Sequence, residues 1–255
     1  MTLEKALGRI DRATKGRYME LNLSNLDLNE VPSQIIRCKN LRHLNLCGNR
    51  LTDIPDELKY LPNLTSLSLS SNYLTYVPTV LSFLSNLTSL YLGSNQLTYL
   101  PVTLRLMSNL TDIYLYNNKI TEIPDDFFEQ MPNLTGLNLD GNQITHISEN
   151  FGQLSKLESL FLEDNQITFI PEVLGQLSNL KQLSLARNQI TLISNVVGQL
   201  SNLVTLNLSA NQITSIPEIF GQLLNLKNLS LEGNQITSIP EALRQLLNVK
   251  ELDMD

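Results

Sequence analysis

The chain has 255 residues, 42 % of them hydrophobic and 17 % charged, and its formal net charge is −7. This acidic balance argues against sequence-independent binding to nucleic acid or to anionic lipid, because both require a basic protein surface. Membrane insertion is not expected either, since no apolar run approaches the ~20 residues that a membrane helix requires.

The first 17 residues form a distinct N-terminal unit. Leu3, Leu7, Ile10 and Thr14 recur at helical spacing, and Gly16 is a suitable C-terminal stop, so the spacing predicts an amphipathic helix over 2–16. The segment lacks the apolar core and small-residue cleavage site of a signal peptide.

From Tyr18 onward a 23-residue unit recurs, typified by Leu157–Asn179. Positions within the unit are counted from its first residue, so Leu157 and Tyr18 are each position 1. Every step is 23 residues except one of 24, between Leu110 and Leu134. Ten full units cover residues 18–248, and a partial eleventh covers 249–255. Such a period predicts a single solenoid in which each unit contacts mainly its neighbours, rather than one or two globular domains.

Each unit opens with the pattern L-x-x-L-x-L, which predicts a short strand with one buried face. An asparagine follows at the ninth position in nine of the ten full units. Because its amide both donates and accepts, we expect these side chains to form a ladder that bonds buried backbone groups of neighbouring turns. The first unit has Leu26 instead.

The second half of each unit is the return limb. Proline or serine at position 15, often followed by an acid, favours the start of a short helix, and Ser148 and Ser194 would be N-caps. The extra residue of the 24-residue unit lies in DDFFEQMPN, which predicts a local bulge at Phe127 and Phe128 on the convex side.

A solenoid leaves an apolar face bare at each end, so we interpret the N-terminal helix as a cap over the first unit. The alternative is a helix that binds a partner. Cys38 and Cys47 fall on opposite sides of the solenoid, and two such cysteines cannot build disulfide-linked caps. The sequence therefore favours a reducing, cytoplasmic location.

Side chains at positions 3, 5, 7, 8 and 10 of each unit leave the core on the strand side. Most are small and polar, but the middle units project aromatic rings, namely Tyr73, Tyr91, Tyr114, Tyr116 and Phe161. We interpret them as an anchor patch for a protein or peptide, since rigid rings dominate interface hot spots. The alternative is that adjacent rings pack on one another and stabilise the sheet.

The same five positions carry ten acids against three basic residues. Those near the aromatic rings are Asp112, Asp140, Glu163 and Asp164, with Arg187 beside them. A partner with basic and apolar residues would complement this surface. The alternative is an acidic surface that only confers solubility.

No catalytic constellation is present in the sequence. His43 and Cys47 are four residues apart on one extended strand, hence ~13 Å, which is too far for a nucleophile–base pair. There is no phosphate-binding glycine loop and no spaced set of metal ligands. We therefore predict a protein that is not an enzyme and needs no cofactor or metal.

The repeated L-x-x-L-x-L-x-x-N-x-L with its proline-containing return limb resembles the leucine-rich repeat family over residues 18–255. The 23-residue period and the I-P-x-x-L-x-x-L-x-N-L limb are similar to the intracellular type found in Ras-group and Roco proteins. This resemblance implies an α/β solenoid curved as a horseshoe, with a parallel sheet on the concave face, short helical or 3-10 return limbs on the convex face and an N-terminal capping helix.

The resemblance further implies a non-catalytic protein–protein interaction scaffold in intracellular signalling, with a small GTPase as one expected kind of partner. Val249, Leu252 and Met254 begin an eleventh strand without a return limb or recognisable cap. This strand is either a bare end or part of a longer chain. The alternative function is therefore the recognition segment of a multidomain signalling enzyme such as a Roco-type GTPase.

Overall fold

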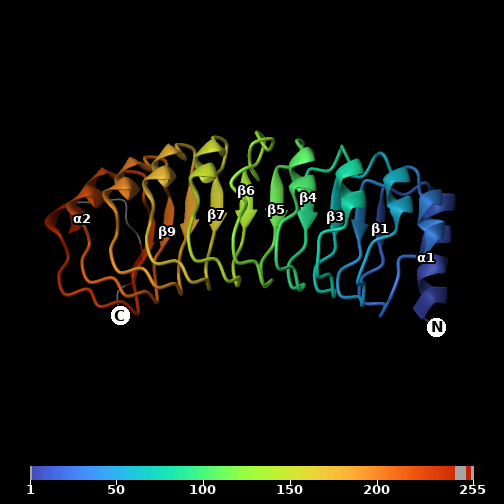
Figure 1. The fold of residues 1–255 in the computed structure, drawn as a ribbon, viewed down its shortest axis with the longest axis horizontal. Helices are drawn as coiled ribbons and strands as arrows, with labels where there is room; N and C mark the ends of the chain where they lie inside the picture. Colours follow the sequence, from blue (N-terminus) through green and yellow to red (C-terminus); the bar gives the residue numbers. More distant parts are fainter. Residues whose placement is uncertain (1, 245–250, 254–255) are drawn as a thin grey trace.

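A computed structural model describes residues 2–244 and 251–253. Over these residues the chain forms one solenoid with an eleven-stranded parallel sheet in sequential strand order, and helix α1 at one end (Figure 1). The strands are β1 Glu20–Asn22, β2 His43–Asn45, β3 Ser66–Ser68, β4 Ser89–Tyr91, β5 Asp112–Tyr114, β6 Gly136–Asn138, β7 Ser159–Phe161, β8 Gln182–Ser184, β9 Thr205–Asn207, β10 Asn228–Ser230 and β11 Glu251–Asp253.

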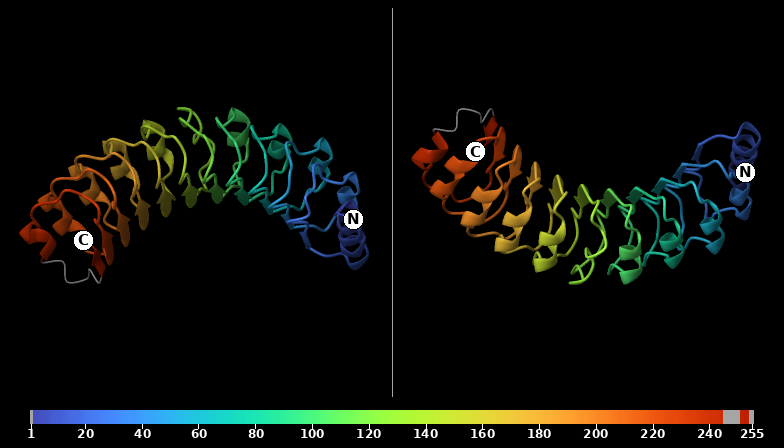
Figure 2. Two further views of the ribbon diagram at one scale, coloured as in Figure 1. Left: turned by 90° about the horizontal axis from the view of Figure 1, so that it is seen from below. Right: turned by 90° about the horizontal axis from the view of Figure 1, so that it is seen from above.

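The solenoid is curved, with the strands on its concave side and the return limbs on its convex side (Figure 2). Neighbouring strands pair in register, so each residue faces its equivalent one repeat later, as Leu160 faces Leu183. The leucines at positions 4 and 6 point inward, and all seven apolar positions of the repeat 157–179 are at most 3 % exposed. The predicted leucine-rich repeat solenoid is confirmed.

Each return limb except one carries a short helix in the described residues. Eight are 3-10 helices: η1 Ser33–Arg37, η2 Asp56–Tyr60, η3 Thr79–Phe83, η4 Val102–Leu106, η5 Glu149–Gln153, η6 Glu172–Gln176, η7 Asn195–Gln199 and η8 Glu218–Gln222. The last, α2 Glu241–Arg244, is a single α-helical turn. None of the helices described is long and apolar enough to cross a bilayer.

The two serine caps differ. Ser194 accepts a hydrogen bond from the Val196 N–H at 3.2 Å, as predicted for an N-cap. Ser148 makes no cap bond; its hydroxyl donates instead to Asn150 Oδ1 at 2.6 Å. That prediction was wrong because the Ser148 hydroxyl is directed at the Asn150 side-chain oxygen and not at a backbone N–H of the helix.

The limb of the 24-residue repeat has no 3-10 helix and runs as a turn over residues 125–130. Phe127 and Phe128 lie on this convex segment as predicted, but both are buried, at 0 % and 2 % exposure. Phe128 packs edge-on against Phe127 and against Phe151 of the next repeat, with ring centroids 5.2 and 5.0 Å apart. The added residue thus brings two large rings into the core.

The predicted asparagine ladder is present. In the fifth repeat, Asn118 Oδ1 accepts from the Leu97 N–H at 3.0 Å, while its Nδ2 donates to the Leu92 carbonyl at 3.0 Å and to the Leu115 carbonyl at 2.9 Å. Leu92 and Leu97 belong to the preceding repeat. Leu26 can replace asparagine in the first repeat because no earlier repeat offers it backbone groups to bond.

Helix α1, Thr2–Gly16, packs over β1 and η1 and covers the first repeat. Its buried side chains are Ala6, Ile10 and Ala13. Leu3, which the helical spacing placed on this face, is 51 % exposed. Ile10 is fully buried and Leu7 and Thr14 are half-buried, so the predicted face is confirmed in part, and Ala6 and Ala13 complete the buried side of the helix.

The expected eleventh strand forms at β11, whose backbone pairs with β10. Val249 and Met254 lie outside the described residues. Cys38 is buried at 3 % exposure, as expected for its core position, and both cysteines are free thiols.

Candidate functional site on the concave face

A stacked pair of tyrosines occupies the concave face of β4 and β5. Tyr91 and Tyr114 are register partners, with ring centroids 4.7 Å apart and planes 4° from parallel. In-register parallel strands repeat at about the spacing of stacked rings, so equal side-chain conformations bring the faces together. This pair fits the sheet-packing interpretation, although each tyrosine remains only half-buried.

The other two predicted tyrosines lie apart from this stack. Tyr116 rests its ring on the backbone of Gly93, the equivalent position one repeat earlier, where any Cβ would overlap the ring. Tyr73 is 50 % exposed and makes no ring contact with the other aromatics among the residues described. The predicted aromatic residues therefore share a face but do not form one continuous cluster.

Three further rings lie in the loops after the strands. Tyr76, Tyr99 and Phe169 are all at least 36 % exposed. A hydrogen bond to Asp53, together with burial, raises the pKa of Tyr76.

Carboxylates and one arginine form a network across the sixth, seventh and eighth repeats. Arg187 forms an ion pair with Glu163 and a second with Asp164, the latter at 2.6 Å. These two carboxylates raise the pKa of the guanidinium, chiefly through the hydrogen bond to Asp164. Four of the predicted site residues, counting Asp140, are thus brought together.

Asp140 is a half-buried member of this network. Its carboxylate accepts a hydrogen bond from the Glu163 N–H at 2.7 Å. In repeats with asparagine at position 5, that side chain accepts the equivalent N–H, as Asn138 does from Asp140. Phe161 has no such oxygen, so Asp140 of the preceding repeat supplies it. Burial, reinforced by Glu163 and Asp164, raises the pKa of Asp140 to about 6.

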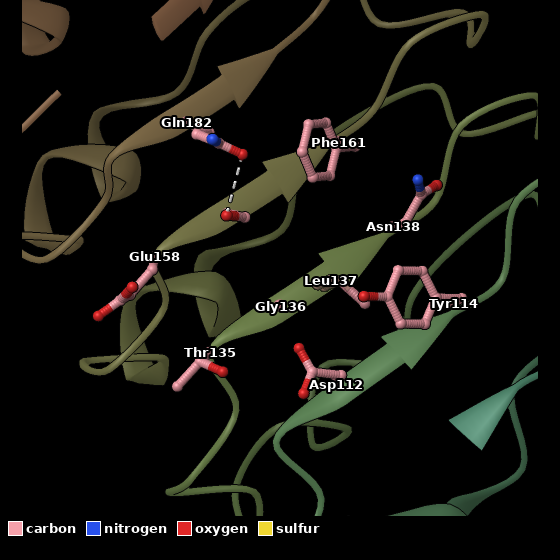
Figure 3. Close-up of a pocket in the computed structure, with 10 residues that line it drawn as sticks. Asp112, Tyr114, Thr135, Gly136, Leu137, Asn138, Glu158, Phe161 and Gln182 are labelled. Carbon is pink, nitrogen blue, oxygen red and sulfur yellow. Dashed lines mark hydrogen bonds between the residues drawn. The ribbon is translucent and has the colours of Figure 1, made fainter. Parts of the chain in front are cut away.

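A hollow of about 300 Å³ lies between the aromatic pair and Phe161 (Figure 3). Asp112 and Tyr114 project from β5, and Phe161 projects from β7. Between them β6 presents Gly136, which has no side chain. The complete lining is Asp112, Tyr114, Thr135, Gly136, Leu137, Asn138, Glu158, Ser159, Phe161 and Gln182.

Sequence reasoning placed the walls of this hollow on the concave face but missed the hollow itself. The available signal was Gly136, because position 3 holds glycine in only one of the ten full repeats. The Asp140–Glu163 bond was also missed, since it depends on which backbone N–H lacks an acceptor.

The arrangement offers rings, carboxylates and hydrogen-bonding groups on an open surface. Within the described part of the chain, no group of three or more histidine, cysteine, aspartate or glutamate side chains could hold a metal ion. These features define a surface that can bind another molecule.

The chain belongs to the leucine-rich repeat family. The "Leucine rich repeat" family matches residues 19–74, 39–97 and 108–167, and "Leucine Rich repeats (2 copies)" matches 85–129, 155–198, 178–221 and 201–244. Leucine-rich repeat proteins generally mediate protein–protein interactions.

Similar solved structures include a leucine-rich repeat protein of Leptospira interrogans, with 36 % identity and a TM-score of 0.90 over 93 % of this chain. The plant peptide hormone receptor RGFR1, in complex with RGF2, is 29 % identical with a TM-score of 0.73 over 88 % of this chain. TLR13, in complex with ssRNA13, is 31 % identical with a TM-score of 0.82 over 98 %.

The chain spans 60 % of the length of the Leptospira structure, 41 % of RGFR1 and 38 % of TLR13. A comparison with curated proteins gives no match.

Proposed function

We propose that this chain is a non-catalytic scaffold that binds a protein or peptide through the concave face of its third to eighth repeats. We call the residues Tyr73, Tyr91, Asp112, Tyr114, Tyr116, Asp140, Phe161, Glu163, Asp164 and Arg187 the concave patch. The observation that carries the proposal is the concentration of aromatic rings and carboxylates on a face that elsewhere presents small polar side chains.

Interface hot spots are enriched in tyrosine and arginine, and half-buried rings lose little conformational freedom on binding. The net negative charge of the concave patch favours a partner that presents basic and apolar side chains. The complex of the similar receptor RGFR1 with RGF2 shows this fold with a bound ligand. By contrast, the acidic surface disfavours a polyanion such as the RNA bound to TLR13.

The 23-residue period supports a cytoplasmic signalling role and a small GTPase as one candidate partner, through its similarity to the Ras-group repeats. Its similarity to Roco repeats supports the second candidate function, the recognition segment of a multidomain signalling enzyme. A native transcript with an in-frame stop codon directly after Asp255 would contradict this second candidate.

The test compares Tyr91→Ala/Tyr114→Ala with wild type by affinity purification from native cell lysate and mass spectrometry. A matched control is Asn45→Ala/Ser68→Ala, which changes the same strand position in β2 and β3, outside the concave patch. We expect a partner that wild type and control retain and the tyrosine variant loses. Its affinity is then measured with purified components.

Thermal unfolding measurements on wild type, the tyrosine variant and the control check that each protein is folded at the assay temperature. If the purified partner binds the folded tyrosine variant as tightly as it binds wild type, the concave patch is not the binding surface. The rings would then serve only to pack the sheet.

A further inference from the structure

The hollow at Gly136 has two aromatic walls, Tyr114 and Phe161, and the Tyr114 ring is held in place by stacking. Tyr114 stacks one face on Tyr91 with centroids 4.7 Å apart, while its side chain also lines the hollow. Phe161 lines this hollow and a second one, of about 250 Å³, on the side of β8 and β9. The walls stand on β5 and β7, two strand spacings or ~10 Å apart. A flat group can enter between them.

The charge in the hollow is negative. Asp112 accepts a hydrogen bond from the Thr111 hydroxyl at 2.8 Å but has no ion-pair partner among the residues described. The other carboxylate, Glu158, is paired with Lys181 at 2.8 Å. The lining includes no lysine or arginine. Asp112 is therefore the charge that a ligand could neutralise.

Gly136 sets both the depth of the hollow and the position of this carboxylate. A Cβ at residue 136 would overlap Asp112 Oδ1. The backbone there does not require glycine, because Gly136 lies within β6 and its φ is not in the left-handed region. The absence of a side chain thus serves the shape of the surface rather than the path of the chain.

We propose that this hollow binds the guanidinium group of an arginine side chain presented by the protein partner, an inference that rests on the proposed scaffold function. A guanidinium is planar, stacks on aromatic faces and can pair with a carboxylate in the same plane. Asp112 receives the charge, and Tyr114 or Phe161 receives the flat face. A lysine ammonium fits less well, because it is a compact and strongly hydrated charge.

The first experiment titrates the full chain with N-acetyl-L-arginine amide and follows backbone amide NMR signals. N-acetyl-L-citrulline amide is the matched neutral probe, since its urea group has a similar shape without the charge. We expect saturable shifts centred on Gly136 with arginine and at least about tenfold weaker binding with citrulline. Equal responses to both probes, or arginine shifts confined to regions outside the hollow, would overturn the inference.

Two variants test the geometry. Asp112→Asn removes the charge, and Gly136→Gln fills the hollow with the residue that β8 carries at the same position, Gln182. Both should weaken arginine binding by about tenfold or more. Ser66→Gln, at that strand position in β3, is the control and should leave binding unchanged.

Partner binding separates this inference from the proposed function. If the partner identified above is lost by Tyr91→Ala/Tyr114→Ala but binds Gly136→Gln as tightly as wild type, the scaffold function stands and the arginine site is overturned. If Gly136→Gln also loses that partner, replacing single arginines of the partner with citrulline should reproduce the loss at one position. No such position would again overturn the arginine site.

Discussion

The fourth to seventh repeats and the eighth to tenth repeats have the same core and different concave faces. Both regions place leucine or isoleucine at position 4, leucine at position 6 and asparagine at position 9, and all of these side chains are buried except Asn234, which is half-buried. At position 5 the first region has Tyr91, Tyr114, Asn138 and Phe161, whereas the second has Ser184, Asn207 and Ser230. This solenoid therefore specifies its fold and its surface with separate sets of residues.

The largest expected effect is the loss of unfolding free energy when a ladder asparagine is removed, and it tests whether the cores of the two regions are equivalent. Asn118→Ala and Asn188→Ala each remove four hydrogen bonds of 2.9–3.3 Å to backbone groups of the asparagine's own repeat and the preceding one. Because buried backbone groups are left unpaired, each should cost about 3 kcal/mol of unfolding free energy. Urea denaturation measures the loss.

The two costs should agree within about 1 kcal/mol, since the environments are repeats of one another. A much smaller loss of unfolding free energy for Asn188→Ala than for Asn118→Ala would show that the cores of the two regions are not equivalent.

The next effect concerns the half-buried carboxylate of Asp140 at position 7, where the eighth and ninth repeats have Ala186 and Ser209 and the tenth has an exposed Glu232. The pKa of Asp140 is about 6 in the folded chain, above its ordinary value of 3.8. The folded state therefore binds this proton more tightly than the unfolded state, and the charged form destabilises the fold above pH 6. As the pH falls from 6 towards 4, that penalty disappears.

Asp140→Asn should thus be more stable than wild type by about 1–2 kcal/mol at pH 7.5, after allowance for its partial exposure, and the difference should vanish near pH 4. The asparagine oxygen can still accept the Glu163 N–H. Denaturation of both proteins across this range measures the trend. A stability difference that does not change with pH would contradict the assigned cause.

A smaller effect is the coupling energy between neighbouring side chains at position 5, which should differ between the stacked tyrosines and the polar pair Ser184 and Asn207. A double-mutant cycle of Tyr91→Ala and Tyr114→Ala should give a coupling energy of about 1 kcal/mol, because the rings stack face to face. The same cycle at Ser184 and Asn207 should give close to zero. If the two coupling energies were equal, the stacked rings would stabilise the sheet no more than the polar pair does.

The smallest effect separates two return limbs. Ser194→Ala removes the N-cap bond to Val196 and should cost about 0.5–1 kcal/mol. Ser148→Ala removes a bond to a side chain and no cap, so we expect a smaller loss of thermal stability. A larger loss at Ser148 would show that its contact with Asn150 matters more than a cap.

The sequence predicted the parts of the fold that repetition makes unambiguous. Leucine and asparagine spacing identified the strands, the ladder and the return limbs because every repeat tests the same pattern again. Features that occur once were harder to predict. The buried face of α1 includes Ala6 and Ala13, whose small side chains the spacing of larger apolar residues does not identify.

The concave patch was predictable as a set of outward-facing positions, but its local geometry was not. Position 8 of every full repeat has a positive φ of 50–68°, and this includes Asp164 and Arg187. The three glycines and two asparagines at that position were a signal of this conformation. The hollow required knowing that Gly136 lies between Tyr114 and Phe161 two strands apart, which is a property of neighbouring repeats rather than of any one.

The asparagine ladder also gives the solenoid a direction. Asn49 accepts a hydrogen bond from the Leu28 N–H and donates one to the Leu23 carbonyl of the first repeat, and Asn118 bonds the equivalent groups of the fourth repeat. Each repeat therefore closes the turn of the one before it. On the ribosome, where the N-terminal part of a chain emerges first, a repeat can complete its hydrogen bonds only after the following asparagine has been synthesised. Folding would then proceed one repeat behind translation.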